Sequence, residues 1–223
     1  MSTPNRLLLL PLLQGLSKEE LLQIAGRVRF NFHNRSRSEV IVSQDCPCRS
    51  LFIATAGELC VQRTSNVGDF VLSEWFPTPF VIQPEALFGW RTHYTHTIVC
   101  ATDVSLLEID KDAVRDVLFH YPAFRISFLN QISYTVQRQE QSLWREPEGS
   151  LYGRFCHFLL QRCLRPAGRK ELKIRKKDLA RHLYASIRYV APFLHNLQAQ
   201  GKIELTRGYL RIPSMERLLN AQT

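Results

Sequence analysis

Basic side chains gather in residues 175–205, a stretch that carries six Lys and Arg residues. Arg188, Tyr189 and His195 fall outside the apolar stripe of a helix predicted in this stretch, and Ser186 stands at its start. Hydrogen-bonding groups near the start of an exposed helix can reach base edges in the major groove of DNA, which is wide enough to admit a helix. We therefore expect these four side chains to contact bases.

Further cations are expected beside this helix, near the phosphates of a duplex. They are Lys176, Lys177 and Arg181 on a preceding helix, and Arg207 in a hairpin turn. Contacts from such side chains to phosphates hold a protein in register on DNA without reading its sequence.

Two predicted helices and a tight corner position these groups. The first helix covers residues 176–183, Tyr184-Ala185 form the corner, and Ser186 is a favourable N-cap for the second helix. The apolar face of the second helix comprises Val190, Leu194 and Leu197. Pro192 removes one hydrogen bond from a helix interior and clashes with the preceding turn. We expect either an irregular first turn, with Pro192 near the start of the regular helix, or a kink.

The surroundings of this helix pair complete the outline of a winged helix. A hinge at Pro147 and Gly149 precedes a helical pattern over residues 151–164. Two short extended stretches, "GKIEL" and "GYLRI", follow the helix pair and are separated by Thr206-Arg207-Gly208. We expect a helical trio followed by a hairpin.

The charge of the chain is unevenly distributed. Residues 1–145 carry 14 Lys and Arg against 14 Asp and Glu, whereas residues 146–223 carry 15 against 6, so the second part holds the entire net charge of +9. A basic module beside a neutral one indicates a polyanionic partner, nucleic acid before an anionic membrane surface. The alternative is a basic surface that is merely well solvated.

The neutral part of the chain predicts a β domain. Ser17 and Glu20 indicate a capped helix, and from about residue 40 to residue 109 short β-rich runs alternate with turn signals. Several short strands at such intervals favour a sandwich or jelly roll. The chain is therefore expected to be an α+β protein with an N-terminal jelly roll.

A long helical pattern, about residues 110–145, closes this part of the chain. Its apolar stripe comprises Leu129, Ile132, Val136 and Leu143. Such a stripe can pair with a second copy of itself, as in a two-stranded coiled coil, and packing against the β domain is the alternative. We expect a dimerisation helix, a first domain of residues 1–145 and a second domain of residues 146–223.

Six cysteines are too sparse to define a disulfide scaffold in a chain of this length. The weak candidates for a metal or redox site are Cys46 and Cys48, with Cys60, Cys100, His93 or His96 as further ligands. Their spacing matches no standard cluster motif, so we expect no metal site and place most cysteines in the core.

Taken together, these motifs resemble the cyclic-AMP receptor protein and fumarate–nitrate regulator (CRP/FNR) family of bacterial transcription factors. The similar segments are "LPLLQGLSKEELLQIA", "EVIVSQDCPCRSLFIATAGELCV" with Gly57 at the turn of a first hairpin, "CATDVSLLEIDKDAVRDVLFHYPAF", Arg154 in "GRFCHFLL", and "DLARHLYASIRYVAPFLHNLQAQGKIEL". The pattern Ser-x-Arg-Tyr is similar to that of the YeiL-like branch. The resemblance implies a jelly-roll sensor, a dimerising helix and a winged helix that binds an inverted-repeat DNA site, with RNA polymerase as a further partner.

The sequence also departs from the family's patterns. Where nucleotide-binding members carry Gly-Glu and Arg-Ser/Thr pairs, this chain has Pro84-Glu85 and Thr95-His96. The resemblance makes Glu85, Arg91, Thr95 and His96 the candidate effector pocket. A cyclic nucleotide is disfavoured because the phosphate-binding Arg is missing at the matching position, so the effector stays unidentified. Ile187, Arg188 and Pro192 also replace the familiar Arg-Glu-x-x-x-Arg reading set.

Other classes of protein fit the sequence less well. It contains no Gly-rich phosphate loop, nucleophile elbow or paired-cysteine zinc motif, so we expect no enzyme. The apolar run of residues 7–13 is short and contains a proline, which excludes a membrane span, and we expect a cytoplasmic protein. The rival function is a ligand- or redox-sensing protein whose basic domain contacts another anionic partner.

Overall fold

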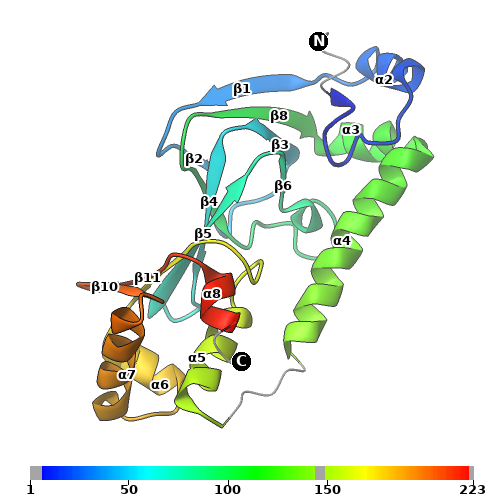
Figure 1. The fold of residues 1–223 in the computed structure, drawn as a ribbon. Helices are drawn as coiled ribbons and strands as arrows, with labels where there is room; N and C mark the ends of the chain where they lie inside the picture. Colours follow the sequence, from blue (N-terminus) through cyan, green and yellow to red (C-terminus); the bar gives the residue numbers. More distant parts are fainter. Residues whose placement is uncertain (1–6, 144–148, 221–223) are drawn as a thin grey trace. The chain divides into compact units, whose positions relative to one another are not determined.

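The structure is a computed structural model that describes residues 7–143 and 149–220 (Figure 1). The chain forms two compact units, and each is described by itself. Unit 1 comprises Met1–Cys60 and Phe76–Gln137, and unit 2 comprises Val61–Trp75 and Arg138–Thr223. The expected division between residues 145 and 146 stays a prediction, and nothing in the sequence indicated that Val61–Trp75 belongs to the second unit.

Unit 1 is built around antiparallel β-strands, as expected. One sheet has the order β1 (Asn31–Arg35), β8 (Val104–Asp110), β3 (Ser50–Ala56) and β6 (Phe80–Ile82). A second pairing joins β2 (Val40–Val42) to β7 (Thr97–Cys100). On one face of β8 the alternate residues Leu107 and Ile109 are fully buried, and on the other face Leu106 is buried while Glu108 is partly exposed.

Gly57 connects β3 to β4 (Glu58–Thr64) with a φ of +99°. A Cβ atom at this position would lie 2.3 Å from the Asp103 carbonyl oxygen, so no other residue fits without movement. The expectation of a hairpin with Gly57 at its turn is wrong, because β3 belongs to the four-stranded sheet and β4 does not. The chain instead leaves the four-stranded sheet at this glycine.

The helices of unit 1 confirm one expectation and correct another. Helix α2 (Lys18–Ala25) begins with the expected capping box between Ser17 and Glu20. The long helix expected from residue 110 is interrupted, since α3 (Lys111–Asp116) and the 3-10 turn η2 (Leu118–His120) precede α4 (Pro122–Leu143). Tyr121 is extended at the break, because a residue before proline is disfavoured in the helical region.

Unit 2 contains the three predicted helices, the predicted hairpin and two elements that were not predicted from the sequence. Its elements are α5 (Leu151–Leu160), β9 (Lys170–Ile174), α6 (Lys176–His182), α7 (Ile187–Ala199), β10 (Glu204–Thr206), β11 (Tyr209–Ile212) and α8 (Met215–Leu219). The missed elements are β9 and α8. One core, which includes Phe155, Leu172, Leu194 and Met215, joins these helices and strands.

Strand β9 lies between β11 and β5 (Phe70–Pro77), so the sheet of unit 2 has the order β10, β11, β9, β5. The pairing of β9 with β5 runs from Phe70 opposite Ile174 to Glu74 opposite Lys170. Strands β4 and β5 thus supply Val61–Trp75, a segment from the middle of the β-rich sequence, to the unit that holds the helix pair.

Candidate nucleic-acid interface

The corner between α6 and α7 has the conformation that a tight turn between two helices requires. Tyr184 adopts a left-handed φ of 49°, and the Ala185 N–H donates to the Ala180 carbonyl. The Ser186 hydroxyl then accepts a hydrogen bond from the Arg188 N–H at 3.3 Å, which confirms Ser186 as the N-cap of α7. Helix, corner and cap therefore lie where the sequence predicts them.

Helix α7 has one buried face and one exposed face. The buried side chains are Val190, Leu194 and Leu197, and the exposed residues include Ser186, Arg188, Tyr189 and His195. All four residues that were expected to contact bases are thus accessible, and 72% of Tyr189 is exposed. The structure brings them together along one helix and its cap.

Pro192 lies inside α7, because the helix begins five residues earlier at Ile187. The alternative that placed Pro192 near the start of the regular helix is therefore wrong. The Arg188 carbonyl, four residues back, faces a residue without an N–H, so this turn lacks one backbone hydrogen bond. The ring of Pro192 is on the exposed side of the helix and leaves the apolar face intact.

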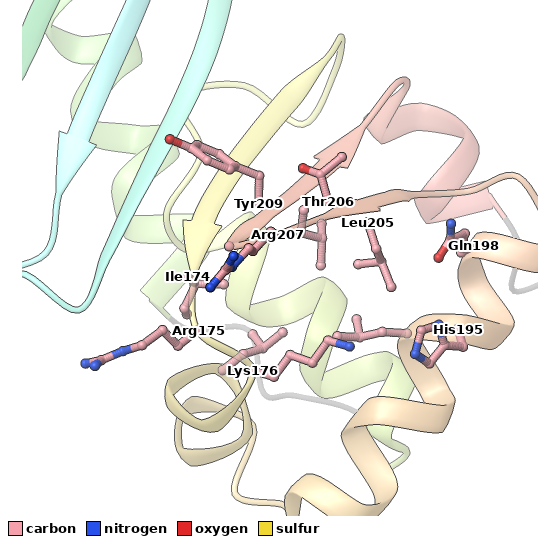
Figure 2. A pocket seen from close by; sticks show the side chains of 13 residues that line it. Ile174, Arg175, Lys176, His195, Gln198, Leu205, Thr206, Arg207 and Tyr209 are labelled. Atoms are coloured by element: carbon pink, nitrogen blue, oxygen red, sulfur yellow. The ribbon is translucent and has the colours of Figure 1, made fainter.

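A cavity of about 760 Å³ opens between the start of α6, α7 and the β10–β11 hairpin (Figure 2). Its floor is apolar and includes Leu179, Leu194 and Leu210. Its polar lining includes Arg175, Lys176, His195, Gln198 and Arg207. Figure 2 shows Lys176 extending toward His195 from the opposite wall.

Three of the predicted DNA-contact residues therefore meet in one groove, namely Lys176, His195 and Arg207. Arg175, for which the sequence predicted no role, joins them. Its position immediately before α6 was the available signal, because a cation at the start of this helix lies beside Lys176. A concave site rimmed by three cations suits a polyanion, and the phosphates of a duplex are anions with fixed spacing.

The other two predicted phosphate contacts lie outside this groove. Lys177 is exposed on α6. The Arg181 guanidinium lies 2.8 Å from an Asp69 carboxylate oxygen and 3.6 Å from one of Asp178. Arg181, Asp69 and Asp178 border a second cavity of about 480 Å³, which is also lined by Val67, Arg175 and His182.

Asp69 is the acidic centre of that second cavity. Its buried carboxylate accepts hydrogen bonds from the Ser65 hydroxyl and Arg181, and its Oδ2 lies 2.7 Å from Nε2 of His182. The hydrogen bond from Ser65, followed by those from His182 and Arg181, lowers the pKa of Asp69 from 3.8 to about 2. Asp69 is therefore ionised at neutral pH and offers Arg181 a fixed negative partner.

The candidate effector residues do not form one charged pocket. Glu85 lies on the 3-10 turn η1 (Pro84–Ala86), and Arg91 is an exposed side chain whose guanidinium lies 2.8 Å from Asp45. Thr95 and His96 are hydrogen-bonded to Gln83 instead. The structure thus brings Thr95 and His96 together but pairs Arg91 elsewhere.

These residues do not fit the cyclic phosphate of a nucleotide. A buried phosphate needs a charged or backbone partner, and the nearest expected guanidinium, that of Arg91, is engaged with Asp45. Pro84 has no backbone N–H, so it cannot donate where the family's glycine stands. The structure and the sequence thus both argue against a cyclic nucleotide as the effector.

The two cysteine candidates, Cys46 and Cys48, differ in their exposure to solvent. Cys46 is exposed, whereas Cys48 is buried with its thiol directed at the Ser50 carbonyl, and burial raises its pKa. A raised pKa keeps a thiol protonated and poorly suited to bind a metal. Within residues 7–143 and 149–220 no group of three His, Cys, Asp or Glu side chains could hold a metal ion.

The predicted dimer stripe is partly on the surface of α4. Leu129 and Val136 are about half exposed, at 52% and 54%, and Ile132 is half-buried. The side chain of Leu143 lies outside the described residues. The opposite side of the helix buries Phe124 and Phe128, so α4 both covers the core of unit 1 and presents apolar side chains to solvent.

The fold and this interface define a DNA-binding protein of the helix-turn-helix type, and comparison with known families specifies it further. The family described as "Cyclic nucleotide-binding domain" matches residues 33–121, and the family described as "Crp-like helix-turn-helix domain" matches residues 153–221. The two matches cover more than half of the chain in the order that the sequence analysis expected. The chain belongs to the CRP/FNR family of transcription regulators, which are generally not enzymes. The YeiL-like branch stays a prediction.

Solved structures share the fold across nearly the whole chain. The catabolite activator protein of Thermus thermophilus is 18% identical, with a TM-score of 0.53 over 94% of this chain and 96% of that one. A putative transcriptional regulator of the Crp/Fnr family from Eubacterium rectale is 20% identical, with a TM-score of 0.53 over 95% and 97%. No curated protein sequence matches the chain. Among the helices of the described residues, none is both long and apolar enough to cross a membrane.

Proposed function

We propose that the protein acts as a homodimer that reads an inverted-repeat operator with α7, under the control of a signal received by unit 1. The exposed face of α7 beside the cation-lined groove is the observation that carries this proposal. A helix that buries Val190 and Leu194 while it exposes Arg188 and Tyr189 can enter a major groove without loss of its own core contacts.

Each basic residue has a distinct role in this proposal. Arg188 and Tyr189 project from the first turn of α7, where they can reach base edges and so supply specificity. Lys176 and Arg207 line the groove beside His195, Lys177 is exposed on α6, and these three contact phosphates, which supply affinity and register. RNA polymerase is a further partner that the family resemblance implies.

The exposed stripe of α4 supports the dimer. Ile126, Leu129 and Val136 lie at spacings of three and seven residues and are all more than half exposed. An apolar stripe with this spacing is covered when a second α4 packs against it in a two-stranded arrangement. Two copies related by a two-fold axis then present two α7 helices, which matches an inverted repeat.

Selection of bound duplexes from a random library tests the proposed function. We expect the full chain to enrich two half-sites in inverted orientation, about one helical turn apart from centre to centre. Enrichment of a single direct half-site, or of no sequence at all, would contradict a dimer that reads an inverted repeat.

A further inference from the structure

Gln83 is a buried polar residue in a strained conformation. It precedes the 3-10 turn η1 with a φ of 42° and a ψ of 56°, and only 7% of it is exposed. Left-handed backbone is uncommon for residues other than glycine and persists where surrounding contacts fix it. The contacts of the Gln83 side chain are therefore the candidates for what fixes this backbone conformation.

The amide of Gln83 forms hydrogen bonds with Thr95 and His96, the two residues that precede β7. Its oxygen accepts hydrogen bonds from the Thr95 N–H at 2.7 Å, the Thr95 hydroxyl at 2.9 Å and the His96 N–H at 3.1 Å. Its nitrogen donates to the His96 carbonyl at 3.0 Å. One side chain thus closes the loop between η1 and β7 from the inside.

Three donors converge on this one oxygen, and Nδ1 of His96 also lies 3.1 Å from it, although an amide oxygen has two lone pairs. Two successive backbone N–H groups and a hydroxyl are a donor set that suits an oxygen of an anion. Thr95 and His96 also stand at the positions of the Arg-Ser/Thr pair that, by the family resemblance, holds the phosphate of a cyclic nucleotide. The donors are present in this chain, and a neutral amide oxygen fills the position among them.

A neutral occupant agrees with the charge of the surroundings. Arg91, the nearest expected cation, pairs with Asp45 at the surface, and Pro84 offers no N–H. A buried phosphate would have to displace Gln83 without gaining a charged partner from Arg91. An uncharged amide oxygen suits the two backbone N–H groups and the hydroxyl, and the His96 ring is the ionisable group beside them.

We propose that Gln83 is a built-in substitute for the ligand phosphate, so that unit 1 closes the loop between η1 and β7 without a cyclic nucleotide. Gln83 is a positioning residue in this role, since it holds the loop and contacts no signal. The signal of this regulator then uses chemistry that does not depend on the Thr95 and His96 donors. The inference concerns unit 1 and does not rest on DNA binding by α7.

Titration and amide hydrogen exchange on the full chain test the proposal together. We expect neither cyclic AMP nor cyclic GMP to bind the wild-type protein at about 1 mM, the weak end of specific affinities. In the absence of nucleotide, the Thr95 and His96 amides should already be protected. Gln83→Ala should accelerate their exchange by at least about tenfold, because it removes the acceptor. Gln14→Ala is the matched control, since Gln14 is exposed and its amide donates to the Leu9 carbonyl, away from this loop.

Two results would overturn the proposal. One is micromolar binding of a cyclic nucleotide to the wild-type chain, and the other is equal exchange of the two amides in wild type and Gln83→Ala. If Gln83→Ala does not fold, Gln83→Asn replaces it, since the shorter side chain keeps the amide but cannot span the same distance. Exchange at Thr95 and His96 in Gln83→Asn as slow as in wild type would then contradict the role given to Gln83.

Discussion

The Lys170 ammonium lies 2.8 Å from a carboxylate oxygen of Glu74, and both side chains are almost completely buried. The same carboxylate accepts hydrogen bonds from the backbone N–H groups of Leu164 and Arg165, and Lys170 also donates to the Ala167 carbonyl. Since Glu74 is on β5 and Lys170 on β9, this ion pair fixes the register of the two strands. A buried pair is tolerated only when its remaining hydrogen-bonding capacity is satisfied in this way.

Removal of one partner should therefore destabilise unit 2 strongly. We expect Lys170→Met to lower the free energy of unfolding by about 3–5 kcal/mol, because it leaves the buried Glu74 charge without its cation. Arg211→Met is the matched control, since it breaks a more exposed pair with Glu171 and should cost about 1 kcal/mol or less. Urea denaturation measures both. Equal midpoints for Lys170→Met and wild type would contradict this role of the pair.

The carboxylate of Asp69 should make stability depend on pH in the acidic range. Its pKa is lowered from 3.8 to about 2 in the folded protein, chiefly by the Ser65 hydroxyl. The resulting stabilisation is fully present above pH 4 and is lost as the pH falls toward 2. The difference in melting temperature between wild type and Asp69→Asn should shrink over this range. A difference that stays constant from pH 5 to about pH 2 would contradict the assigned shift.

Asp69 should also oppose DNA binding, because it occupies the Arg181 guanidinium. We expect Asp69→Asn to bind duplex DNA about two- to fivefold more tightly and to steepen the salt dependence by about one released counterion. Fluorescence anisotropy over a range of salt concentrations measures both effects.

Asp45→Asn is the control for Asp69→Asn, since it changes the net charge equally but frees Arg91 in unit 1. The double variant Asp69→Asn/Arg181→Gln should lose the gain in affinity. If Asp45→Asn tightened binding as much as Asp69→Asn, the effect would be one of net charge, and the specific role of Asp69 would be wrong.

The apolar stripe of α4 should hold the dimer together. Leu129→Glu/Val136→Glu places two charges on this stripe, and we expect the protein to sediment as a monomer. Asn130→Glu/Gln141→Glu adds the same charge beside the stripe, at exposed positions, and should leave the dimer intact. A wild-type monomer at micromolar concentration, or a dimer of the stripe variant, would refute pairing through α4.

The parts of the fold that could be predicted from the sequence depend on local signals. The Ser17 and Ser186 caps, the Tyr184 corner and the buried stripe of α7 each follow from a few neighbouring residues. The break before Pro122 had a local signal too, which the apolar periodicity of the surrounding residues outweighed. The α7 residues expected to contact bases are exposed because they lie off this buried stripe.

The features that could not be predicted depend on partners far away in the sequence. Strand β9 contains Lys170, which looks like a surface residue until Glu74 is placed beside it. Gln83 was not singled out because its amide acts through the backbone of Thr95 and His96. In the same way, the pairing of Arg181 with Asp69 requires Val61–Trp75 to join unit 2, which no pattern within either segment indicates.

The most direct test of the central claim compares Arg188→Ala and Lys177→Ala on the selected operator and on a scrambled duplex at one salt concentration. Arg188→Ala should lose about 1–3 kcal/mol on the operator and little on the scrambled duplex, whereas Lys177→Ala should weaken both alike. An Arg188→Ala variant that keeps the wild-type ratio of the two affinities would show that this face of α7 does not read DNA.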